Sequence, residues 1–454
     1  MKSATKNYMS PKTVVHKLLN IFRRILPAWV FQLQHYLEAR IAQVLYRNPS
    51  KSMFTIGIVG SKGKTTTANI LWGILNDAKN PAGLIGTSDI QIADETIKNH
   101  WHKTMPGRWY TQQLLSKMKA AGCKYVILEV PSEAQQNWRH IGINFDLIIF
   151  TNVTNEILAI HKNSLELLHI HNKRLLKNLH KLKKKKLEDK KIPKTVIANK
   201  DSEFFDQYAN LKADKHLSYS IDSASDFKPS DVKSGLTGST FKLLGQNFKL
   251  NVPGSINVSN ATAAIATAST IGQSPKHISD KLADYKGVPG RMNLIDQGQP
   301  FTVIIDYAHE ESGLSYLVEW ANQSKPKGAN VISLICGQGG GRDVKKRPLM
   351  GEIAAKNCQS VVISNDDVYD DDPQDIIDDI VKGCKKVRPD LKGIYQIQDR
   401  RNGIAKALSL AKKNDIVLIT GKGNDPSSII AGVKIPWDEY AVTKEELAKL
   451  GYKG

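Results

Sequence analysis

The sequence predicts an α/β protein with a phosphate-loop (P-loop) central domain, a Rossmann-like C-terminal α/β domain and a short helical N-terminal segment. Short apolar, β-branched runs alternate with segments of helical spacing, as buried parallel strands and crossover helices do. A glycine turn at residues 60–63 also joins one such run directly to a helical segment. We expect the three parts to span residues 1–52, 53–286 and 287–454.

The composition is that of an ordinary globular protein. The chain has 454 residues, of which 41% are hydrophobic and 24% charged, so two or three domains can each have a core. No apolar run reaches the roughly 18 to 20 residues that a membrane span needs. The four cysteines stand far apart without a C-x-x-C pair, which fits a reducing cytoplasm. We therefore expect a cytoplasmic protein.

The net charge of +20 is concentrated in part in the lysine-rich residues 172–194. Such a charge suits nucleic acid or an anionic membrane. The run lacks interleaved aromatic residues, however, and the solvated face of a helix is its simplest interpretation. We expect no nucleic-acid partner.

Residues 14–46 have apolar positions at helical spacing and predict one or two helices. Basic residues stand beside apolar ones, without the compact apolar core and small-residue cleavage site of a secretion signal. A cap packed on the next domain is the favoured interpretation. A dimer contact and a helix lying on a membrane are the alternatives.

Apolar, β-branched runs predict the buried strands of both α/β domains. In the central domain they cover residues 54–59, 124–130 and 146–152, and a more polar stretch at about 195–250 predicts short strands and turns. In the C-terminal domain they cover residues 301–309, 331–337, 360–366 and 415–423.

The turn after the first strand has the composition of a P-loop. Glycines let backbone N–H groups approach a polyphosphate, Lys64 reaches the β- and γ-phosphates, and the hydroxyl of Thr65 binds Mg²⁺. Ile58 stands where the longer consensus has its first glycine. The predicted nucleotide-binding residues of the loop are Gly60, Ser61, Lys62, Gly63, Lys64, Thr65 and Thr66.

A carboxylate at the end of the next apolar run supplies a second candidate metal ligand. Glu129 ends the run KYVILEV at the sheet edge where such folds place ligands. A solvated glutamate at a strand end is the alternative.

Several motifs then follow in a fixed order: GSKGKTTT (60–67), TMPGRW (104–109), LEVPSEA (128–134), TNVTNEILAIH (151–161), VPGSINVSNATAAIATA (252–268), GVPGRMN (287–293), DYAH (306–309), GQGGGRDVKKRPLMGEIA (337–354), NDDVYDDDP (365–373) and ITGKGND (419–425). This ordered set resembles the Mur ligases, and among them the MurE branch. The resemblance covers residues 53 to 445.

The resemblance implies an ATP-dependent amide ligase of peptidoglycan precursor synthesis. ATP phosphorylates a substrate carboxylate to an acyl phosphate, and an amine then displaces the phosphate. The implied substrates are UDP-N-acetylmuramoyl-L-alanyl-D-glutamate and a diamino acid such as meso-diaminopimelate or L-lysine. ATP and Mg²⁺ are the implied cofactors, with Thr65 and Glu129 as metal ligands and Lys64 on the phosphates.

Further roles transfer by position. The resemblance implies nucleotide contacts for Asn257, Asn260, Arg291, Asp306 and His309, and substrate contacts for Thr104, Pro106 and Ser132. It also implies a carbamylated lysine that binds a second Mg²⁺, for which Lys173 fits best. Lys177 lies one turn further along, and a plain surface lysine is the alternative.

The family's amino-acid subsite falls on Asp366, Asp367, Val368 and Tyr369, where diaminopimelate-adding members have Asp-Asn-Pro-Arg. The arginine that binds a distal carboxylate is therefore absent. Arg342, Gly421 and Asp425 match further substrate positions. The acidic run 370–372 favours a distal ammonium, or else caps the next helix.

The sequence departs from the family pattern in three places. Ile157 replaces a metal-binding histidine, for which His161 can substitute on the same helical face after the acid Glu156. Pro131 and Glu133 replace the usual serine and histidine. The customary N-terminal UDP-binding domain is expected to be missing. Two alternatives therefore stay open: a Mur-type ligase for a folate or another, lipid-linked, precursor, and a relict nucleotide-binding scaffold.

Overall fold

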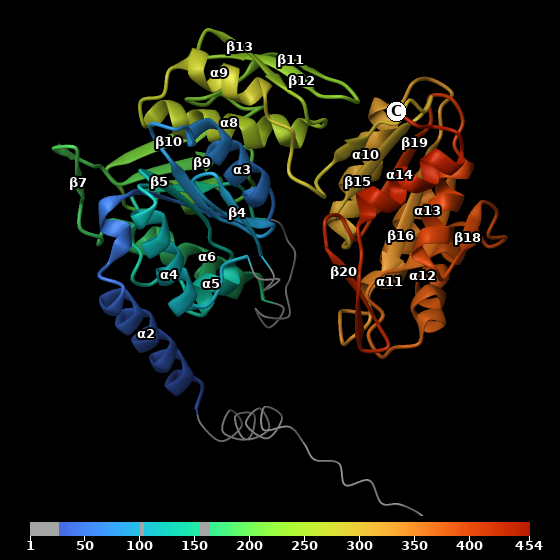
Figure 1. The fold of residues 1–454 in the computed structure, drawn as a ribbon, viewed down its shortest axis with the longest axis horizontal. Coiled ribbons are helices and arrows are strands. Elements are labelled where there is room, and N and C mark those ends of the chain that lie inside the picture. The colour runs from blue at the N-terminus through green and yellow to red at the C-terminus, as the bar shows by residue number, and fades with distance from the viewer. Residues whose placement is uncertain (1–26, 100–103, 154–163) are drawn as a thin grey trace, which may run out of the picture. The chain divides into compact units, whose positions relative to one another are not determined.

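A computed structural model describes residues 27–99, 104–153 and 164–454 (Figure 1). The chain forms two compact units: the described parts of residues 1–64 with 75–217, and residues 65–74 with 218–454. Among the described helices, none is both long and apolar enough to cross a membrane. The predicted three-part division of the chain stays a prediction.

The first unit is built on an eight-stranded sheet in the order β10-β9-β6-β1-β5-β2-β3-β4. Strand β1 lies between β5 and β6 and is parallel to both, and β9 and β2 continue the parallel part. Strands β3 and β4 add antiparallel pairs. The predicted strands of the central domain are therefore confirmed. The bounds are β1 Phe54–Val59, β2 Ala82–Ile85, β3 Asp89–Ile92, β4 Glu95–Lys98, β5 Tyr125–Glu129, β6 Leu147–Phe150, β9 Thr195–Asn199 and β10 Lys215–Tyr219.

Helices flank this sheet, and α2 lies at the edge of the unit (Figure 1). One face of α2 packs on α4: the guanidinium of Arg108 lies 3.0 Å from a carboxylate oxygen of Glu38. The indole N–H of Trp138 donates to Gln32 at 2.6 Å. The helical prediction is confirmed for this stretch, and residues 14–26 lie outside the described residues. The bounds are α2 Ala28–Leu45, η1 Pro49–Ser52, α4 Arg108–Ala120, α5 Ser132–Gln136, α6 Leu165–Leu179 and α7 Phe205–Ala209.

The lysine-rich stretch departs from its expected form. Helix α6 ends at Leu179, and the run continues as a hairpin of β7 (Lys186–Leu187) and β8 (Lys190–Lys191). Lys185 and Lys194 are buried, and their ammonium groups lie 2.5 Å and 3.1 Å from the two carboxylate oxygens of Asp146. The prediction of a solvated helix face is wrong for Lys185 and Lys194, because both are buried and paired with Asp146. They lie beside the residues where neighbouring strands begin.

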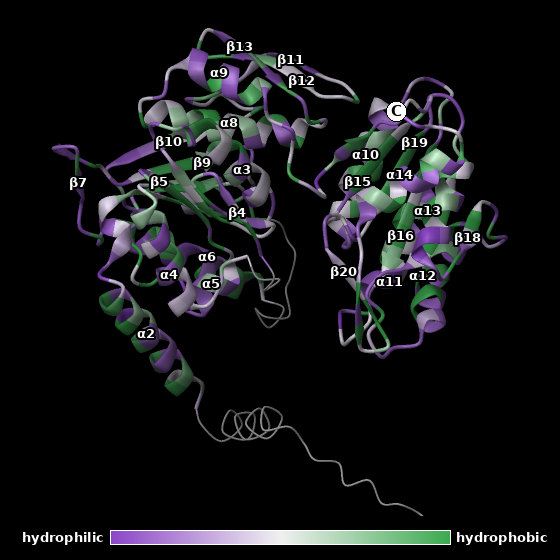
Figure 2. Cartoon of the chain, viewed as in Figure 1, coloured by the Kyte–Doolittle hydropathy of each residue, from purple (hydrophilic) through white to green (hydrophobic). Residues whose placement is uncertain are grey.

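The second unit contains a six-stranded sheet in the order β14-β15-β19-β16-β17-β18, parallel except for β14. Its central strands are hydrophobic along their length (Figure 2) and fully buried. The predicted strands of the C-terminal domain are thereby confirmed. The bounds are β14 Asn293–Ile295, β15 Thr302–Asp306, α10 Glu311–Ser324, β16 Val331–Gly337, α11 Lys346–Asn357, β17 Ser360–Asn365, α12 Pro373–Val387, β18 Ile394–Gln396, α13 Arg400–Ser409, β19 Ile416–Thr420, β20 Ser427–Ile430, β21 Val433–Pro436 and α14 Glu439–Lys449.

The remaining elements of the second unit are three helices and a small antiparallel sheet, β11-β12-β13. Helix α3, which follows the glycine turn, is joined to α9 by a hydrogen bond between His277 Nε2 and the carbonyl of Ile74 at 3.0 Å. The bounds are α3 Lys64–Leu75, β11 Ser230–Ser234, β12 Ser239–Leu243, β13 Gln246–Leu250, α8 Ser255–Thr270 and α9 Pro275–Ala283.

Candidate functional site

The glycine turn after β1 is held by two residues at the end of β6. The N–H of Ser61 donates to the carbonyl of Asn152 at 2.8 Å, and the N–H of Lys62 donates to the side chain of Asn152 at 2.9 Å. The hydroxyl of Thr151 donates to the carbonyl of Lys62 at 2.7 Å. Gly60 has a φ of 137°, and a Cβ there would overlap Thr151. No role for Thr151 or Asn152 is predicted from the sequence, although both begin the motif TNVTNEILAIH (151–161).

The predicted phosphate lysine lies over this loop. Lys64 Nζ donates to the carbonyls of Gly60 at 2.7 Å and Ser61 at 2.8 Å. Because α3 begins at Lys64, the loop ends at a helix N-terminus, with Thr65 and Thr66 in the first turn. Such an end attracts anions through its free N–H groups and its partial positive charge. A phosphate bound here would replace the two carbonyls as the partner of the ammonium group.

Glu129 lies at the same sheet edge as the loop, because β5 pairs with β1 in a register that sets Glu129 opposite Ile58. Its side chain is fully buried. One carboxylate oxygen accepts the N–H of Thr87 at 2.8 Å, and the other accepts the Thr87 hydroxyl at 2.9 Å. The alternative of a solvated strand-end glutamate is therefore wrong. The hydroxyl of Thr104 is 3.1 Å from that of Thr87, so the predicted substrate loop adjoins this carboxylate.

The loop around Thr104 and Pro106 is anchored by Arg139. Its guanidinium donates to the carbonyl of Met105 at 3.0 Å and to Glu133 at 2.8 Å. Glu133, one of the departures from the family pattern, thus orients the arginine that holds the loop. Ser132 is buried at the start of α5. Sequence reasoning missed Arg139, because no motif contains it.

Lys173 projects from α6, the helix that α5 holds through Gln135. Its ammonium donates to the side-chain oxygen of Gln207 at 2.7 Å and lies 5.4 Å from the centre of the Tyr208 ring. Burial and the neighbouring Lys177 both lower the pKa of Lys173, which favours the neutral amine that carbamylation requires. His161, Glu156 and Ile157 lie outside the described residues.

The motifs PGR and DYAH meet in the second unit. The carboxylate of Asp306 accepts the N–H groups of Met292 and Ala308, both at 2.8 Å. Burial raises the pKa of Asp306, and Arg291 opposes the shift. The Arg291 guanidinium lies 5.0 Å over the ring of Tyr307.

His309 lies at the end of this group. Its ring meets that of Tyr307 edge to face at 4.7 Å, and its Nδ1 lies 2.9 Å from the Tyr307 carbonyl. Burial lowers the pKa of His309. Arg291, Asp306 and His309, which the resemblance assigns to the nucleotide, therefore form one local group.

The two predicted asparagines face α3 rather than solvent. Both are buried on α8, and the amide of Asn260 donates to the side-chain oxygen of Asn257 at 3.3 Å. The hydroxyl of Thr67 on α3 lies 3.5 Å from the side-chain oxygen of Asn260. The pair thus joins α8 to the helix that follows the P-loop.

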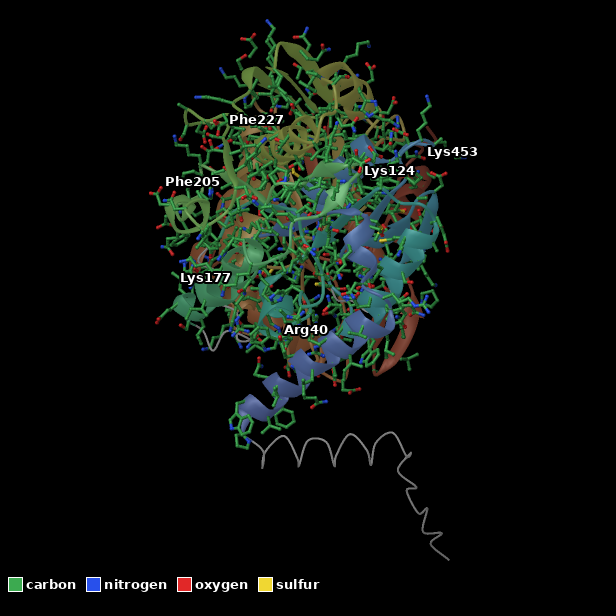
Figure 3. All side chains as sticks on the ribbon, turned by 90° about the vertical axis from the view of Figure 1, so that its left-hand side faces the viewer. Arg40, Lys124, Lys177, Phe205, Phe227 and Lys453 are labelled. Carbon is green, nitrogen blue, oxygen red and sulfur yellow. The ribbon has the colours of Figure 1, made fainter. Side chains whose placement is uncertain are left out.

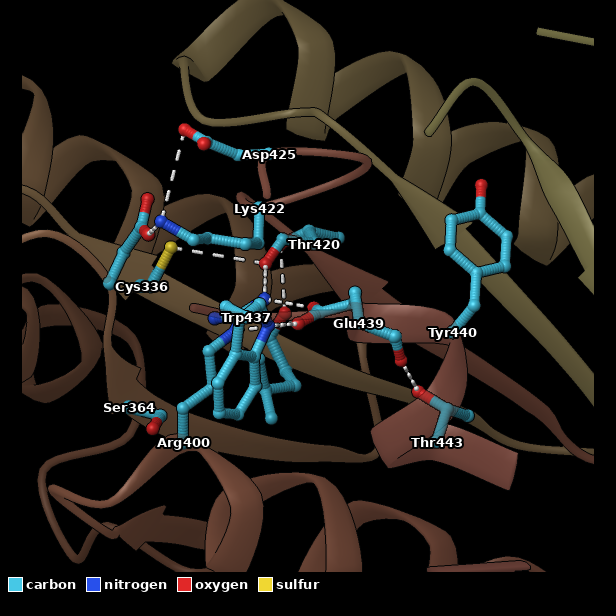
Figure 4. A network of polar contacts seen from close by, with 12 residues as sticks. Cys336, Ser364, Arg400, Thr420, Lys422, Asp425, Trp437, Glu439, Tyr440 and Thr443 are labelled. Atoms are coloured by element: carbon cyan, nitrogen blue, oxygen red, sulfur yellow. Dashed lines mark hydrogen bonds and ion pairs between the residues drawn. The ribbon is translucent and has the colours of Figure 1, made fainter. Parts of the chain in front are cut away.

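Lys422 brings together three acidic residues of the predicted amino-acid subsite (Figure 4). Its ammonium lies 2.9 Å from Asp366, 2.8 Å from Asp367 and 3.9 Å from Asp425. Burial alone would lower the pKa of Lys422, but the three carboxylates outweigh it and raise the pKa to about 12. The cluster therefore contains a buried cation that sequence reasoning did not assign.

A buried ion pair lies beneath this cluster (Figure 4). Arg400 pairs with Glu439 and donates to the carbonyl of Thr420 at 2.8 Å. The indole of Trp437 donates to Glu439 at 2.6 Å. This pair fixes the end of β19, from which the loop with Gly421 and Lys422 continues.

Two residues of the acidic run 370–372 make contacts within the fold. Asp372 caps α12 by accepting the N–H of Gln374 at 2.7 Å, which confirms the helix-cap alternative for this residue. Asp371 lies 3.6 Å from the guanidinium of Arg347. Arg342 is exposed.

Comparisons with known proteins agree with these motifs. The Mur ligase middle domain family matches residues 58–268, and the Mur ligase, glutamate ligase domain family matches residues 290–423. A UDP-N-acetylmuramoyl-L-alanyl-D-glutamate–2,6-diaminopimelate ligase of Caldanaerobacter subterraneus is 33% identical over 90% of this chain and 81% of that protein. A UDP-N-acetylmuramyl-tripeptide synthetase of Roseiflexus is 33% identical over 92% and 82%.

A solved diaminopimelate ligase of the same name as the first relative superposes with a TM-score of 0.63 at 23% identity, covering 92% of this chain and 84% of that one. The matched families, the fold and the phosphate loop define the class of protein: an ATP-dependent ligase that forms an amide bond. The chain belongs to the Mur ligase family, and its similarities place it on the MurE-like branch.

Proposed function

We propose that this protein adds a diamino acid to the D-glutamate carboxylate of UDP-N-acetylmuramoyl-L-alanyl-D-glutamate, by way of an acyl phosphate, in peptidoglycan precursor synthesis. One observation carries the proposal. The loop that contains Lys64 follows β1, and the buried Glu129 ends β5, the strand that pairs with β1, so the loop and Glu129 lie at one edge of the same sheet. A relict scaffold would have no reason to keep a carboxylate buried beside a phosphate loop.

The chemistry needs cations between two anions, and positioning more than proton transfer. In the proposed mechanism, the loop N–H groups and Lys64 hold the phosphates of ATP. Thr65 and Glu129 are the proposed Mg²⁺ ligands, and the metal would neutralise charge that develops on the transferred phosphoryl group. The fit rests on Glu129, whose buried carboxylate oxygens accept hydrogen bonds from Thr87 at the same sheet edge as the loop.

Lys173 is proposed to be carbamylated. A neutral amine adds CO₂ and loses one proton, which turns the side chain into an anionic oxygen ligand for a second Mg²⁺. The lowered pKa of Lys173 supports this choice over the exposed Lys177. His161 remains a proposed ligand of the same site.

The remaining substrate and nucleotide contacts are proposed from the resemblance, position by position. Thr104, Pro106 and Ser132 would line the muramoyl dipeptide. Arg291, Asp306 and His309 would contact the nucleotide, together with Asn257 and Asn260. Arg342, Asp366, Asp367, Tyr369, Gly421 and Asp425 would form the subsite for the incoming amino acid. The proposed domains of the chain span residues 1–52, 53–286 and 287–454.

The amino-acid subsite favours a distal ammonium over a distal carboxylate. Tyr369 replaces the arginine that would hold a carboxylate. Arg347 cannot readily take over this role, because its guanidinium is engaged by Asp379 at 3.0 Å and by the carbonyl of Gln338 at 2.6 Å. We therefore propose that lysine or ornithine is used better than diaminopimelate.

We propose that the reaction takes place in the cytoplasm. All four cysteines are unpaired and buried, and burial raises the pKa of Cys336 and Cys358 to about 12. Thiols kept protonated and unpaired are what a reducing compartment maintains.

The test is phosphate release by the full chain with ATP, Mg²⁺, bicarbonate and UDP-N-acetylmuramoyl-L-alanyl-D-glutamate, with lysine, ornithine or diaminopimelate added separately. We expect turnover with one amine, loss of turnover in Lys64→Ala, and normal turnover in Lys79→Ala, a change of the same type at an exposed lysine. Nucleotide binding without turnover on any amine would contradict the proposal and favour a different precursor or a relict site.

A further inference from the structure

Helix α2 has two faces of different character. On one face Ala39 and Ala42 are buried, and Glu38 is paired with Arg108 of α4. Gln32 and Tyr36 on the same face meet Trp138, by a hydrogen bond and an edge-to-face ring contact. This face fixes the helix on the first unit.

The opposite face is apolar and exposed. We define the apolar face of α2 as the side chains that recur every three or four residues there and are 48% to 68% exposed: Trp29, Leu33, Leu37, Ile41, Val44 and Leu45. Among residues 27–99, 104–153 and 164–217, no neighbouring element covers this stripe. A continuous stripe of this kind marks an interaction surface, unlike single exposed apolar residues.

On helix α2 itself, the exposed charge beside the apolar face is positive. Within the described helix α2, Gln34 and Arg40 are the polar residues exposed beside it, and no exposed residue is acidic; Figure 3 labels Arg40 on α2. The chain that immediately precedes the helix contributes positive charge and, in residues 1–27, no aspartate or glutamate. Its basic residues are Lys2, Lys6, Lys12, Lys17, Arg23 and Arg24.

The lysine-rich stretch 181–191, which includes the hairpin β7–β8 and contains more lysines than its two exposed acids Glu188 and Asp189, adds net positive charge near the other end of α2. The N–H of Asn144 donates to the hydroxyl of Ser50 in η1 at 3.0 Å, and its side chain donates to the carbonyl of Lys183 at 3.1 Å. The stretch that leads into the hairpin is thereby joined to η1, which follows α2. Arg47 and Lys51 in the connecting segment are exposed as well.

We propose that the apolar face of α2 binds the surface of a membrane that contains anionic phospholipid. A helix with one apolar stripe, a tryptophan at its end and cationic flanks lies in the plane of such an interface, with its apolar side chains among the acyl chains. The exposed Arg40, Arg47 and Lys51 are then available to the anionic headgroups.

Two other occupants from this chain fit less well. A second copy docked on the same face would bring Arg40 and the basic flanks of both copies together. The preceding residues, folded back onto the face, would likewise add cations to cations. An anionic surface instead complements the charge and covers the whole length of the stripe. The inference goes beyond the ligase activity, which does not require a membrane.

The experiment is flotation of the full chain with vesicles of phosphatidylglycerol and phosphatidylcholine, and with vesicles of phosphatidylcholine alone. The variant Leu37→Gln with Ile41→Gln removes apolar area without changing charge. Leu450→Gln is the matched control, since Leu450 is 44% exposed at the far end of the chain. Melting temperature and oligomeric mass are measured for each protein.

We expect binding to the anionic vesicles, weaker binding in 1 M salt, where the Debye length is about 3 Å, and little binding to phosphatidylcholine alone. The double variant should lose on the order of tenfold or more in vesicle partition at an unchanged melting temperature. The control should bind as the unmodified protein does.

Three results would overturn the proposal. One is no flotation of the unmodified protein with anionic vesicles. Another is equal flotation of the double variant, which would assign binding to the preceding residues alone. The third is a dimer in solution that the double variant dissociates, which would make the face a contact between two copies.

Discussion

Replacing Asp146 with asparagine removes the carboxylate that neutralises two buried lysines. The side chains of Lys185 and Lys194 are 2% and 1% exposed. Burial lowers the pKa of Lys185 to about 8, even though Asp146 opposes the shift. At pH 7 the ammonium is therefore still charged in the folded protein. Without the carboxylate its pKa falls further, and the group gives up its proton rather than remain charged and unpaired.

Because Lys185 can lose its proton, the variant does not have to keep an unpaired buried charge, and this limits the electrostatic loss of stability. The interval between a pKa of about 8 and pH 7 corresponds to about 1.4 kcal/mol at Lys185. Asp146 also accepts the N–H of Thr55 and both ammonium groups. The asparagine oxygen keeps part of this set, and each lost bond costs about 1 kcal/mol. We expect a total loss of about 3 kcal/mol in the free energy of unfolding at pH 7, at the lower end of the cost of breaking a buried pair.

The pH dependence gives the sharper test. Because the folded-state pKa of Lys185 is below that of the unfolded chain, the unfolded state binds more protons between about pH 8 and pH 10.5. The unmodified protein therefore gains stability as the pH rises through this window. By pH 9 its Lys185 is mostly neutral. The variant then has no additional proton to lose, and the difference between the two proteins should shrink by about 1.4 kcal/mol.

The assay is urea unfolding at pH 7 and pH 9, followed by circular dichroism. The control is Asp189→Asn, which removes the carboxylate of an exposed pair with Lys186 and should produce no measurable change. A loss that is the same at both pH values, or as small as that of the control, would refute the reasoning.

Three further outcomes are expected. Gly60→Ala should abolish nucleotide binding measured by titration calorimetry, because the added Cβ would overlap Thr151, which follows β6. The control is Gly73→Ala, whose Cβ would lie in open space within α3. It should stabilise the helix by about 0.5 to 1 kcal/mol. Lys422→Met should lower the melting temperature and raise the KM for the amino acid, since it leaves buried carboxylates unpaired, at a cost of about 3 kcal/mol or more. Asp372→Ala should cost about 1 kcal/mol of stability by removing a helix cap, without changing which amine is used.

Each of these outcomes has a contrary result that is easy to recognise. Normal nucleotide affinity in Gly60→Ala would mean that the loop relaxes away from β6. An unchanged melting temperature in Lys422→Met, equal to that of the exposed Lys434→Met, would mean that the carboxylates are hydrated. A change of amine preference in Asp372→Ala would assign the acidic run to substrate recognition.

The sequence alone determined the local elements and their order. The strand at residues 54–59, the glycine turn and the helix that follows are encoded within about twenty consecutive residues, so spacing and composition suffice to predict them. The ordered motifs likewise identified the family. The cap at Asp372 was an open alternative for the same reason, since its signal lies within a few residues.

Tertiary structure decided the contacts between residues far apart in the chain. Asn152 holds the N–H of Lys62 across 90 positions, and Lys185 reaches Thr55 across 130. Lys422 meets Asp367 across 55. Each contact depends on strand order and register, which local patterns do not specify.

The same division holds for α2. Its apolar periodicity predicted a helix, but periodicity gives no information on which face packs inward. That choice depended on Arg108 and Trp138, which come from elements more than sixty positions away and engage the polar side of the helix. The sequence determined that α2 is amphipathic, and only the fold decided that its apolar side faces outward, because burial depends on the surface that a neighbouring element presents.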